Sequence, residues 1–113
     1  MPSVTNSTKS VSPWSETVIA SSNTWQQLSA TSQYCQRIPI SAPTALNTVG
    51  KVNSGNILIK WGLSSAPSGG TAQSGGVTLQ PTQNGITYIL CADPSLVWIY
   101  GTSGDAVEWG PEL

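Results

Sequence analysis

The chain has 113 residues, enough for one domain, and only 8% of them are charged, against about 25% in a typical soluble protein. Four basic and five acidic residues, a net charge of −1 and the absence of His argue against nucleic-acid binding, His-based acid–base catalysis and metal ligation. Small polar residues replace charge, since 42 of the 113 residues are Ser, Thr, Asn or Gln. We therefore predict a protein that is not an enzyme, with no catalytic residues, no cofactor and no metal site.

The first 15 residues (MPSVTNSTKSVSPWS) are rich in Ser, Thr and Pro and follow no structural period. We predict that residues 1–15 form an extended N-terminal arm, with Trp14 anchoring it where it meets a surface. The first 20 residues have neither a basic start nor a continuous apolar stretch, so no secretory signal is expected. No apolar run reaches the length of a membrane span, and we expect the chain to fold in the cytoplasm.

The rest of the chain, 16–113, divides into short segments rich in Val, Ile, Thr, Trp and Tyr, the residues that suit a pleated, half-buried surface. No segment shows helical periodicity over more than ten positions. The pattern predicts a single all-β domain, a β-sandwich or jelly-roll of about eight short antiparallel strands. The expected strands are 16–20 (ETVIA), 24–28 (TWQQL), 33–40 (QYCQRIPI), 56–63 (NILIKWGL), 77–80 (VTLQ), 86–92 (ITYILCA), 96–100 (LVWIY) and 105–109 (DAVEW).

Turn residues separate these segments, as at Asn84-Gly85, Asp93-Pro94 and Ser103-Gly104-Asp105. One connection is unusually long, the Gly/Ser-rich stretch 64–76 (SSAPSGGTAQSGG), which contains SGG twice. Loops of this length inside a domain are often functional. We predict either a surface excursion or a loop that orders against a neighbouring subunit.

Two late segments, 86–92 and 96–100, are apolar on both faces, whereas a sandwich strand normally alternates between apolar and polar residues. In a two-layer domain only one face of a sheet meets the domain's own core, so the second face needs cover. The low charge points the same way, because interface cores are depleted in charged residues. We predict a tightly packed homo-oligomer, the alternative being a monomer whose own loops cover these strands. The predicted interface residues are Trp14, Ile89, Val97, Trp98, Ile99 and Tyr100.

Few residues offer chemistry. Cys35 and Cys91 are predicted to be reduced, half-buried thiols, with a disulfide formed after release from the cell as the alternative. Asp105 and Glu108 are close in sequence but adjoin a turn, where acidic residues commonly serve solubility. The Trp residues within strands are interpreted as core or interface residues, although exposed aromatic rings on a β-sandwich could also stack on sugars.

The order of five motifs resembles small all-β virion proteins of tailed bacteriophages. The motifs are TWQQL (24–28), QRIPI (36–40), GNILIKWG (55–62), VTLQP (77–81) and SLVWIYG (95–101). The resemblance covers roughly residues 24–109. It implies a capsid decoration (cement) protein, a β-sandwich or jelly-roll homotrimer that binds the major capsid protein on the outer capsid and stabilises contacts between capsomers.

The sequence thus predicts a non-enzymatic virion structural protein, assembled in the host cytoplasm and located on the capsid surface. A head-fibre or tail component is the alternative within the virion. A carbohydrate- or receptor-binding β-sandwich, with a glycan as partner, is the alternative outside it. Neither nucleic acid nor a membrane is an expected partner.

Overall fold

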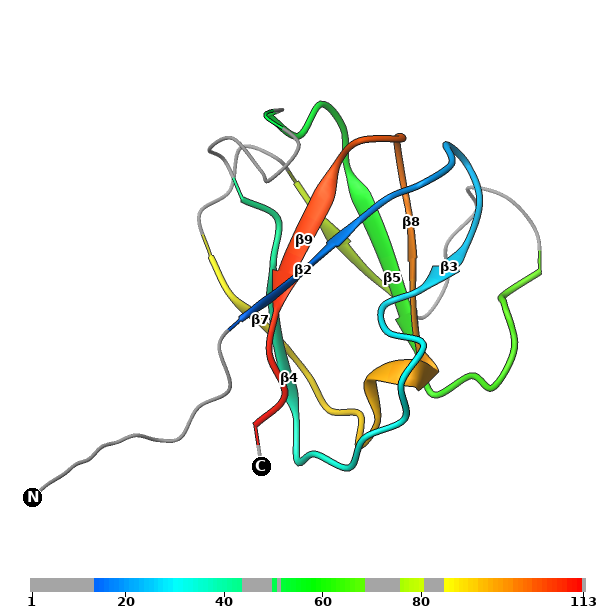
Figure 1. Cartoon of the computed structure of the whole chain (residues 1–113), viewed down its shortest axis with the longest axis vertical. Helices are drawn as coiled ribbons and strands as arrows, with labels where there is room; N and C mark the ends of the chain where they lie inside the picture. The colour runs from blue at the N-terminus through cyan, green and yellow to red at the C-terminus, as the bar shows by residue number, and fades with distance from the viewer. Residues whose placement is uncertain (1–13, 44–49, 51, 69–75, 81–84, 113) are drawn as a thin grey trace, which may run out of the picture.

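The computed structural model describes residues 14–43, 50, 52–68, 76–80 and 85–112, which form two four-stranded antiparallel sheets (Figure 1). The strand order is β2-β9-β4-β7 in the first sheet and β3-β8-β5-β6 in the second. The expectation of an all-β chain of about eight strands is confirmed for the described residues, and each predicted segment overlaps one strand. The strands are β2 (Ser15–Val18), β3 (Gln26–Gln27), β4 (Ile38–Ser41), β5 (Ile57–Trp61), β6 (Val77–Leu79), β7 (Thr87–Ile89), β8 (Val97–Tyr100) and β9 (Ala106–Trp109).

The chain doubles back on itself between β5 and β6. Antiparallel pairs join the strands from the outside inwards along the sequence, namely β2 with β9, β3 with β8, β4 with β7 and β5 with β6. Two further pairs, β4 with β9 and β5 with β8, complete the sheets. As a result, among the described residues, β9, β4, β8 and β5 are central strands, and β2, β7, β3 and β6 are edges.

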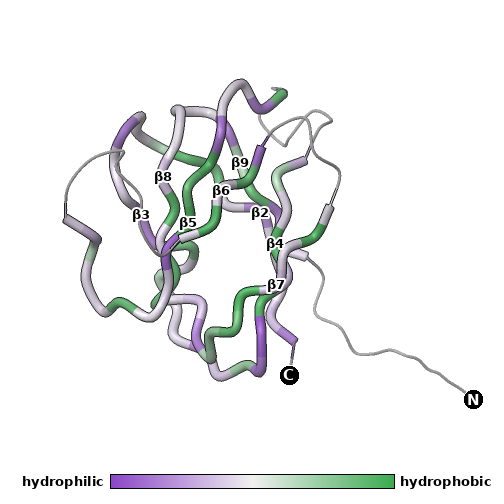
Figure 2. Tube along the Cα trace, turned by 180° about the vertical axis from the view of Figure 1, so that it is seen from behind, coloured by the Kyte–Doolittle hydropathy of each residue, from purple (hydrophilic) through white to green (hydrophobic). Residues whose placement is uncertain are grey.

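The core lies between the two sheets and is built by the alternation that the strands carry in sequence. Ile38 and Ile40 of β4 face Ile57 and Ile59 of β5, and all four side chains are fully buried in one hydrophobic cluster. Hydrophobic residues are prominent along β5 and β8 when the chain is seen from behind (Figure 2). Burying each such side chain stabilises the fold by roughly 1.5–3 kcal/mol relative to leaving it in water.

Four of the residues that we predicted at a subunit interface lie inside the domain instead, and this corrects their assignment. Ile89, Val97 and Ile99 have no exposed surface and belong to the central hydrophobic cluster. Tyr100 is also buried, and its ring packs on Trp25 with 5.0 Å between ring centroids. The reason is that Val97 and Ile99 lie on the face of β8 that meets the core, while Tyr100, on the other face, is covered by Trp25 of the same chain.

The expected turns at Asp93-Pro94 and Ser103-Gly104-Asp105 connect these strands, whereas Asn84 of the third lies outside the described residues. The described residues contain no helix beyond a single 3-10 turn. This turn, η1 (Pro94–Leu96), is capped by Asp93, whose carboxylate accepts the backbone N–H of Ser95. Gly104 has φ of +91°, a left-handed conformation that suits glycine, in the predicted turn before β9. Of the predicted arm and long loop, residues 1–13 and 69–75 lie outside the described residues, and β2 already begins at Ser15.

Candidate functional site

The outer face of the first sheet carries four of the six large apolar side chains that are exposed among the described residues, namely Trp14, Ile86, Tyr88 and Leu90. Ile38, Ile40 and Ile89 point into the core, so their neighbours in the strands point outwards. On the edge strand and its two flanking positions, Ile86, Tyr88 and Leu90 are 50%, 48% and 78% exposed.

Strand register extends this apolar strip across the sheet. Tyr88 lies opposite Pro39, the backbone N–H of Gly110 donates to the Pro39 carbonyl at 3.2 Å, and Trp14 lies against Gly110. A Cβ added to Gly110 would lie 3.7 Å from the Trp14 ring, an ordinary van der Waals distance, so the indole lies over this position of the sheet. Pro39 and Gly110 are buried, and Trp14 is 41% exposed. We call the surface formed by Trp14, Pro39, Ile86, Tyr88, Leu90 and Gly110 the β7 face.

Charged residues border the β7 face at both ends. Arg37 lies over the Tyr88 ring, 4.2 Å from its centroid, and forms an ion pair with Glu112. The hydrogen bond from Arg37 to Glu112 raises the pKa of the guanidinium, which therefore stays charged. At the other end, Glu16 and Glu108 are directly opposite each other in the β2–β9 ladder. The face is therefore an apolar strip between a cation–π pair and two carboxylates.

The backbone of β7 also forms part of this surface, because β7 is an edge strand. The Pro39 carbonyl points at β9, where it accepts the backbone N–H of Gly110. Because backbone groups alternate in direction along a strand, the N–H and C=O groups of Ile38 and Ile40 point at β7 instead. Their partners in β7, Ile89 and Thr87, consequently point back at β4. Tyr88 lies between Thr87 and Ile89, so its backbone N–H and C=O point in the opposite direction, away from β4 and in the plane of the sheet.

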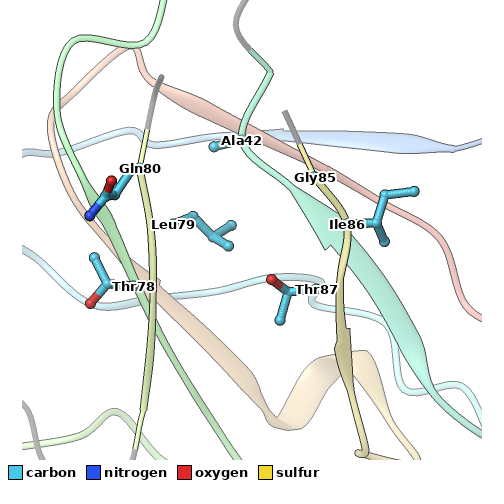
Figure 3. Close-up of a pocket in the computed structure, with 7 residues that line it drawn as sticks. All are labelled: Ala42, Thr78, Leu79, Gln80, Gly85, Ile86 and Thr87. Carbon is cyan, nitrogen blue, oxygen red and sulfur yellow. The ribbon is translucent and has the colours of Figure 1, made fainter. Parts of the chain in front are cut away.

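A small cleft of about 100 Å³ separates β7 from β6, the edge strand of the second sheet (Figure 3). Leu79 and Thr87 point into this space, whereas Ile86 points away from it towards the outer face. A shallower groove of about 630 Å³ lies on the outer side, where Ile86 and Tyr88 line it together with Ser41 and Glu108. The two hollows place β7 between an opening into the sandwich and an open outer face.

Of the predicted interface residues, Trp14 and Trp98 keep accessible surface. Trp14 lies on the β7 face, whereas Trp98 is half-buried on the outer side of the second sheet, where its indole N–H donates to the Leu63 carbonyl at 2.9 Å. The structure does not bring these two side chains together. The pattern of segment 86–92 predicts two apolar faces, but without strand order it does not show which of them is exposed.

The residues considered for chemistry, Cys35, Cys91 and Asp105, are buried inside the domain. Both cysteines are free and buried, and burial, together with nearby Cys91 and Asp93, raises the pKa of the Cys35 thiol and disfavours the thiolate. The buried Asp105 carboxylate accepts the backbone N–H groups of Ser54 and Gly55, both at 3.0 Å, which fixes a loop and leaves it no access to a substrate. Among the described residues no group of His, Cys, Asp or Glu could hold a metal ion. No helix in this part of the chain is long and apolar enough to cross a membrane.

Comparisons with known proteins do not extend these observations. No family model, no curated protein and no solved structure matches the chain. The proposals below therefore depend on the residues and geometry of this chain alone.

Proposed function

We propose that this protein is a non-enzymatic assembly protein that binds another protein surface through the β7 face, and that it serves as a capsid decoration protein of a tailed bacteriophage. The observation that carries the proposal is the row of apolar residues that crosses the first sheet from Trp14 to Tyr88, with an exposed aromatic ring at each end, on a chain with few charges. Exposed apolar patches of this kind on small proteins mark interaction sites. The flat outer face of a sheet suits contact with a broad partner surface better than enclosure of a small substrate.

Strand order supports the choice of fold within this proposal. Eight strands paired from the outside inwards, and divided between two sheets, are expected for a jelly-roll, an architecture of viral capsid domains and of lectins. A fold by itself does not assign a function. The sequence motifs that resemble phage virion proteins favour the capsid over other settings.

The partner in this proposal is the major capsid protein, and the location is the outer surface of the capsid. The protein acts there as a homo-oligomer, for which the resemblance predicts a trimer. A head-fibre or tail position would use the same face against a different virion protein.

Rebinding to capsids tests the proposal. Purified wild-type protein is expected to bind capsids that lack it and to raise the temperature at which they burst. Trp14→Ala is expected to weaken rebinding at least about tenfold, because aromatic anchors dominate protein interfaces. Val52→Ala is the matched control, since Val52 is a similarly exposed apolar residue in the connection between β4 and β5. No rebinding by the wild type, or equal rebinding by both variants, would contradict the proposal.

One observation favours a carbohydrate-binding module as a second candidate. Trp14 and Tyr88 are two exposed aromatic rings in one row of the sheet, and Glu16 and Glu108 lie in the adjacent row. Rings of this kind stack on sugar faces, and carboxylates accept hydrogen bonds from sugar hydroxyls. Binding of the wild type to a glycan array, abolished by Trp14→Ala, without binding to capsids would select this candidate.

A further inference from the structure

We infer that two copies of this chain pair through their β7 strands, across a two-fold axis that passes beside Tyr88, and join their first sheets into one continuous sheet. This inference deepens the proposed assembly function by naming a partner for the edge of β7, a second copy of the chain. The β7 face remains available for the capsid, because edge pairing uses the backbone in the plane of the sheet and leaves much of its outer face uncovered.

The direction of the backbone groups sets the register of this pairing. The N–H and C=O of Tyr88 point away from β4, and the same groups of Ile86 and Leu90 follow them by alternation. When two such edges meet antiparallel with Tyr88 opposite the Tyr88 of the second copy, these residues form the hydrogen-bonded pairs. Each pair exchanges two backbone hydrogen bonds, which is the regular antiparallel pattern.

The side chains of the segment 86–90 (ITYIL) match themselves in this register. Tyr88 faces its own copy, and Ile86 faces Leu90 of the second copy, so aromatic lies opposite aromatic and aliphatic opposite aliphatic on the outer face. On the inner face Thr87 lies opposite Ile89 of the second copy. A two-fold contact brings the same patch of both subunits together and therefore requires such self-complementarity.

β7 is only three residues long, and its edge lacks two of the devices that keep edge strands apart, charged residues and Pro. Proteins protect exposed edges with charged residues, especially Lys, or with Pro, and residues 85–92 (GITYILCA) contain neither. At the opposite edge of the same sheet, β2 carries Glu16 and is preceded by Pro13. The contrast selects β7, and not β2, as the edge that pairs.

A charge-swap experiment tests this register on the full chain. We expect the wild type, measured by sedimentation or light scattering, to have twice its 11.8 kDa monomer mass, or six times that mass where two of the predicted trimers pair through β7. A lone trimer would contradict the pairing. Tyr88→Lys and Tyr88→Glu are each expected to raise the dissociation constant at least about tenfold, because like charges then lie directly opposite across the axis. Mixing the two variants is expected to restore a mixed dimer, since Lys then faces Glu. Val52→Lys is the control for a charge on a similarly exposed apolar residue.

A second pair of variants tests the off-axis positions and guards against a folding defect. Ile86→Lys alone should weaken pairing, and adding Leu90→Glu to the same chain should restore it, because residue 86 faces residue 90 of the second copy. Circular dichroism confirms that each variant is folded. A wild type that is monomeric at all concentrations, an oligomer unaffected by Tyr88→Lys, or the absence of both restorations would overturn the inference. Capsid rebinding in any of these cases would leave the proposed function standing, so the two failures are distinguishable.

Discussion

The two sides of the sandwich, where the edges of the two sheets come together, are built differently. On the side of β2 and β3, side chains cross from one sheet to the other. Gln26 accepts the backbone N–H of Ala20 at 2.9 Å and donates to the Val18 carbonyl at 3.1 Å, and the Thr17 hydroxyl donates to the Leu28 carbonyl at 2.8 Å. On the side of β6 and β7, no hydrogen bond joins the two strands among the described residues, and a cleft lies between them.

The difference shows that the four edge strands of this small domain are not covered in the same way. A sandwich that does not close into a barrel leaves unpaired backbone groups at each edge, and these invite association. The β2–β3 side is sealed from within by polar side chains of the same chain. The β6–β7 side has exposed apolar residues, which are features of a surface that binds another chain. For this reason β7 is the strand proposed for contact with the capsid and with a second copy of the chain.

The largest expected effect concerns the core that both sides share. Ile99→Ala should destabilise the fold by about 3–4 kcal/mol, because Ile99 is fully buried and truncation leaves a cavity. Leu90→Ala, which truncates an exposed aliphatic residue beside β7, should change the free energy of unfolding of the subunit by less than about 0.5 kcal/mol. Urea denaturation of both variants measures the difference.

Protein concentration distinguishes a core role for Ile99 from the interface role that the sequence suggested. The loss caused by Ile99→Ala should be the same at low and high concentration, because it arises within one subunit. A loss that grows or shrinks with concentration would return Ile99 to a subunit contact.

The second expected effect is at Asp105, which fixes two segments of the chain. Its carboxylate holds Ser54 and Gly55, and its carbonyl accepts the backbone N–H of Ile19, just after β2, at 2.8 Å. Asp105→Ala should cost about 2–3 kcal/mol, because it leaves the two loop N–H groups without their acceptor. Glu108→Ala is the matched control, since Glu108 is a nearby acidic residue that is only half-buried. Equal thermal midpoints for the two variants would contradict this role of Asp105.

Much of the fold could be predicted from the sequence, because short runs of β-branched and aromatic residues separated by turn residues locate strands. Strand order could not. The segments 86–92 and 96–100 are both apolar on two faces, yet β8 is central and covered by Trp25, whereas β7 is an edge whose outer face is open. Hydrophobic pattern reports that a face is apolar and does not report what covers it. For that reason the predicted interface included Ile99 and left out Tyr88.

Contacts between distant polar residues were equally beyond sequence analysis. Arg37 and Glu112 are 75 positions apart, and Asn53 exchanges hydrogen bonds with the backbone of Ala106 across 53 positions. Nothing in the residue types marks these pairs. The pair of Arg37 and Glu112 follows from strand pairing, which brings β4 beside β9, whereas the pair of Asn53 and Ala106 joins the connection before β5 to β9 of the other sheet.

The third prediction concerns the side-chain hydrogen bonds between β3 and the end of β2. Gln26→Ala removes the two hydrogen bonds that cross from β3 to the end of β2 and should cost about 1–2 kcal/mol. Gln80→Ala is the matched control, because Gln80 lines the cleft of the open side and is exposed. It should shift stability by less than about 0.5 kcal/mol. Hydrogen exchange at Ala20 should quicken in the Gln26 variant alone, and unchanged exchange there would argue against a side-chain seal.

The smallest expected effect is a pH dependence from Asp93, which follows β7 on the open side. Hydrogen bonds from Ser32, Ser95 and Gln33 lower the pKa of this carboxyl from 3.8 to about 2. Because the folded-state pKa is the lower one, the carboxylate stabilises the fold above about pH 4, and this contribution disappears as the pH falls towards 2. Asp93→Asn, which cannot lose a proton, should therefore lose less stability than the wild type between pH 4 and pH 2. Denaturation curves across this range measure the two slopes, and parallel slopes would show that the tie between residues 32–33 and η1 does not depend on the charge of Asp93.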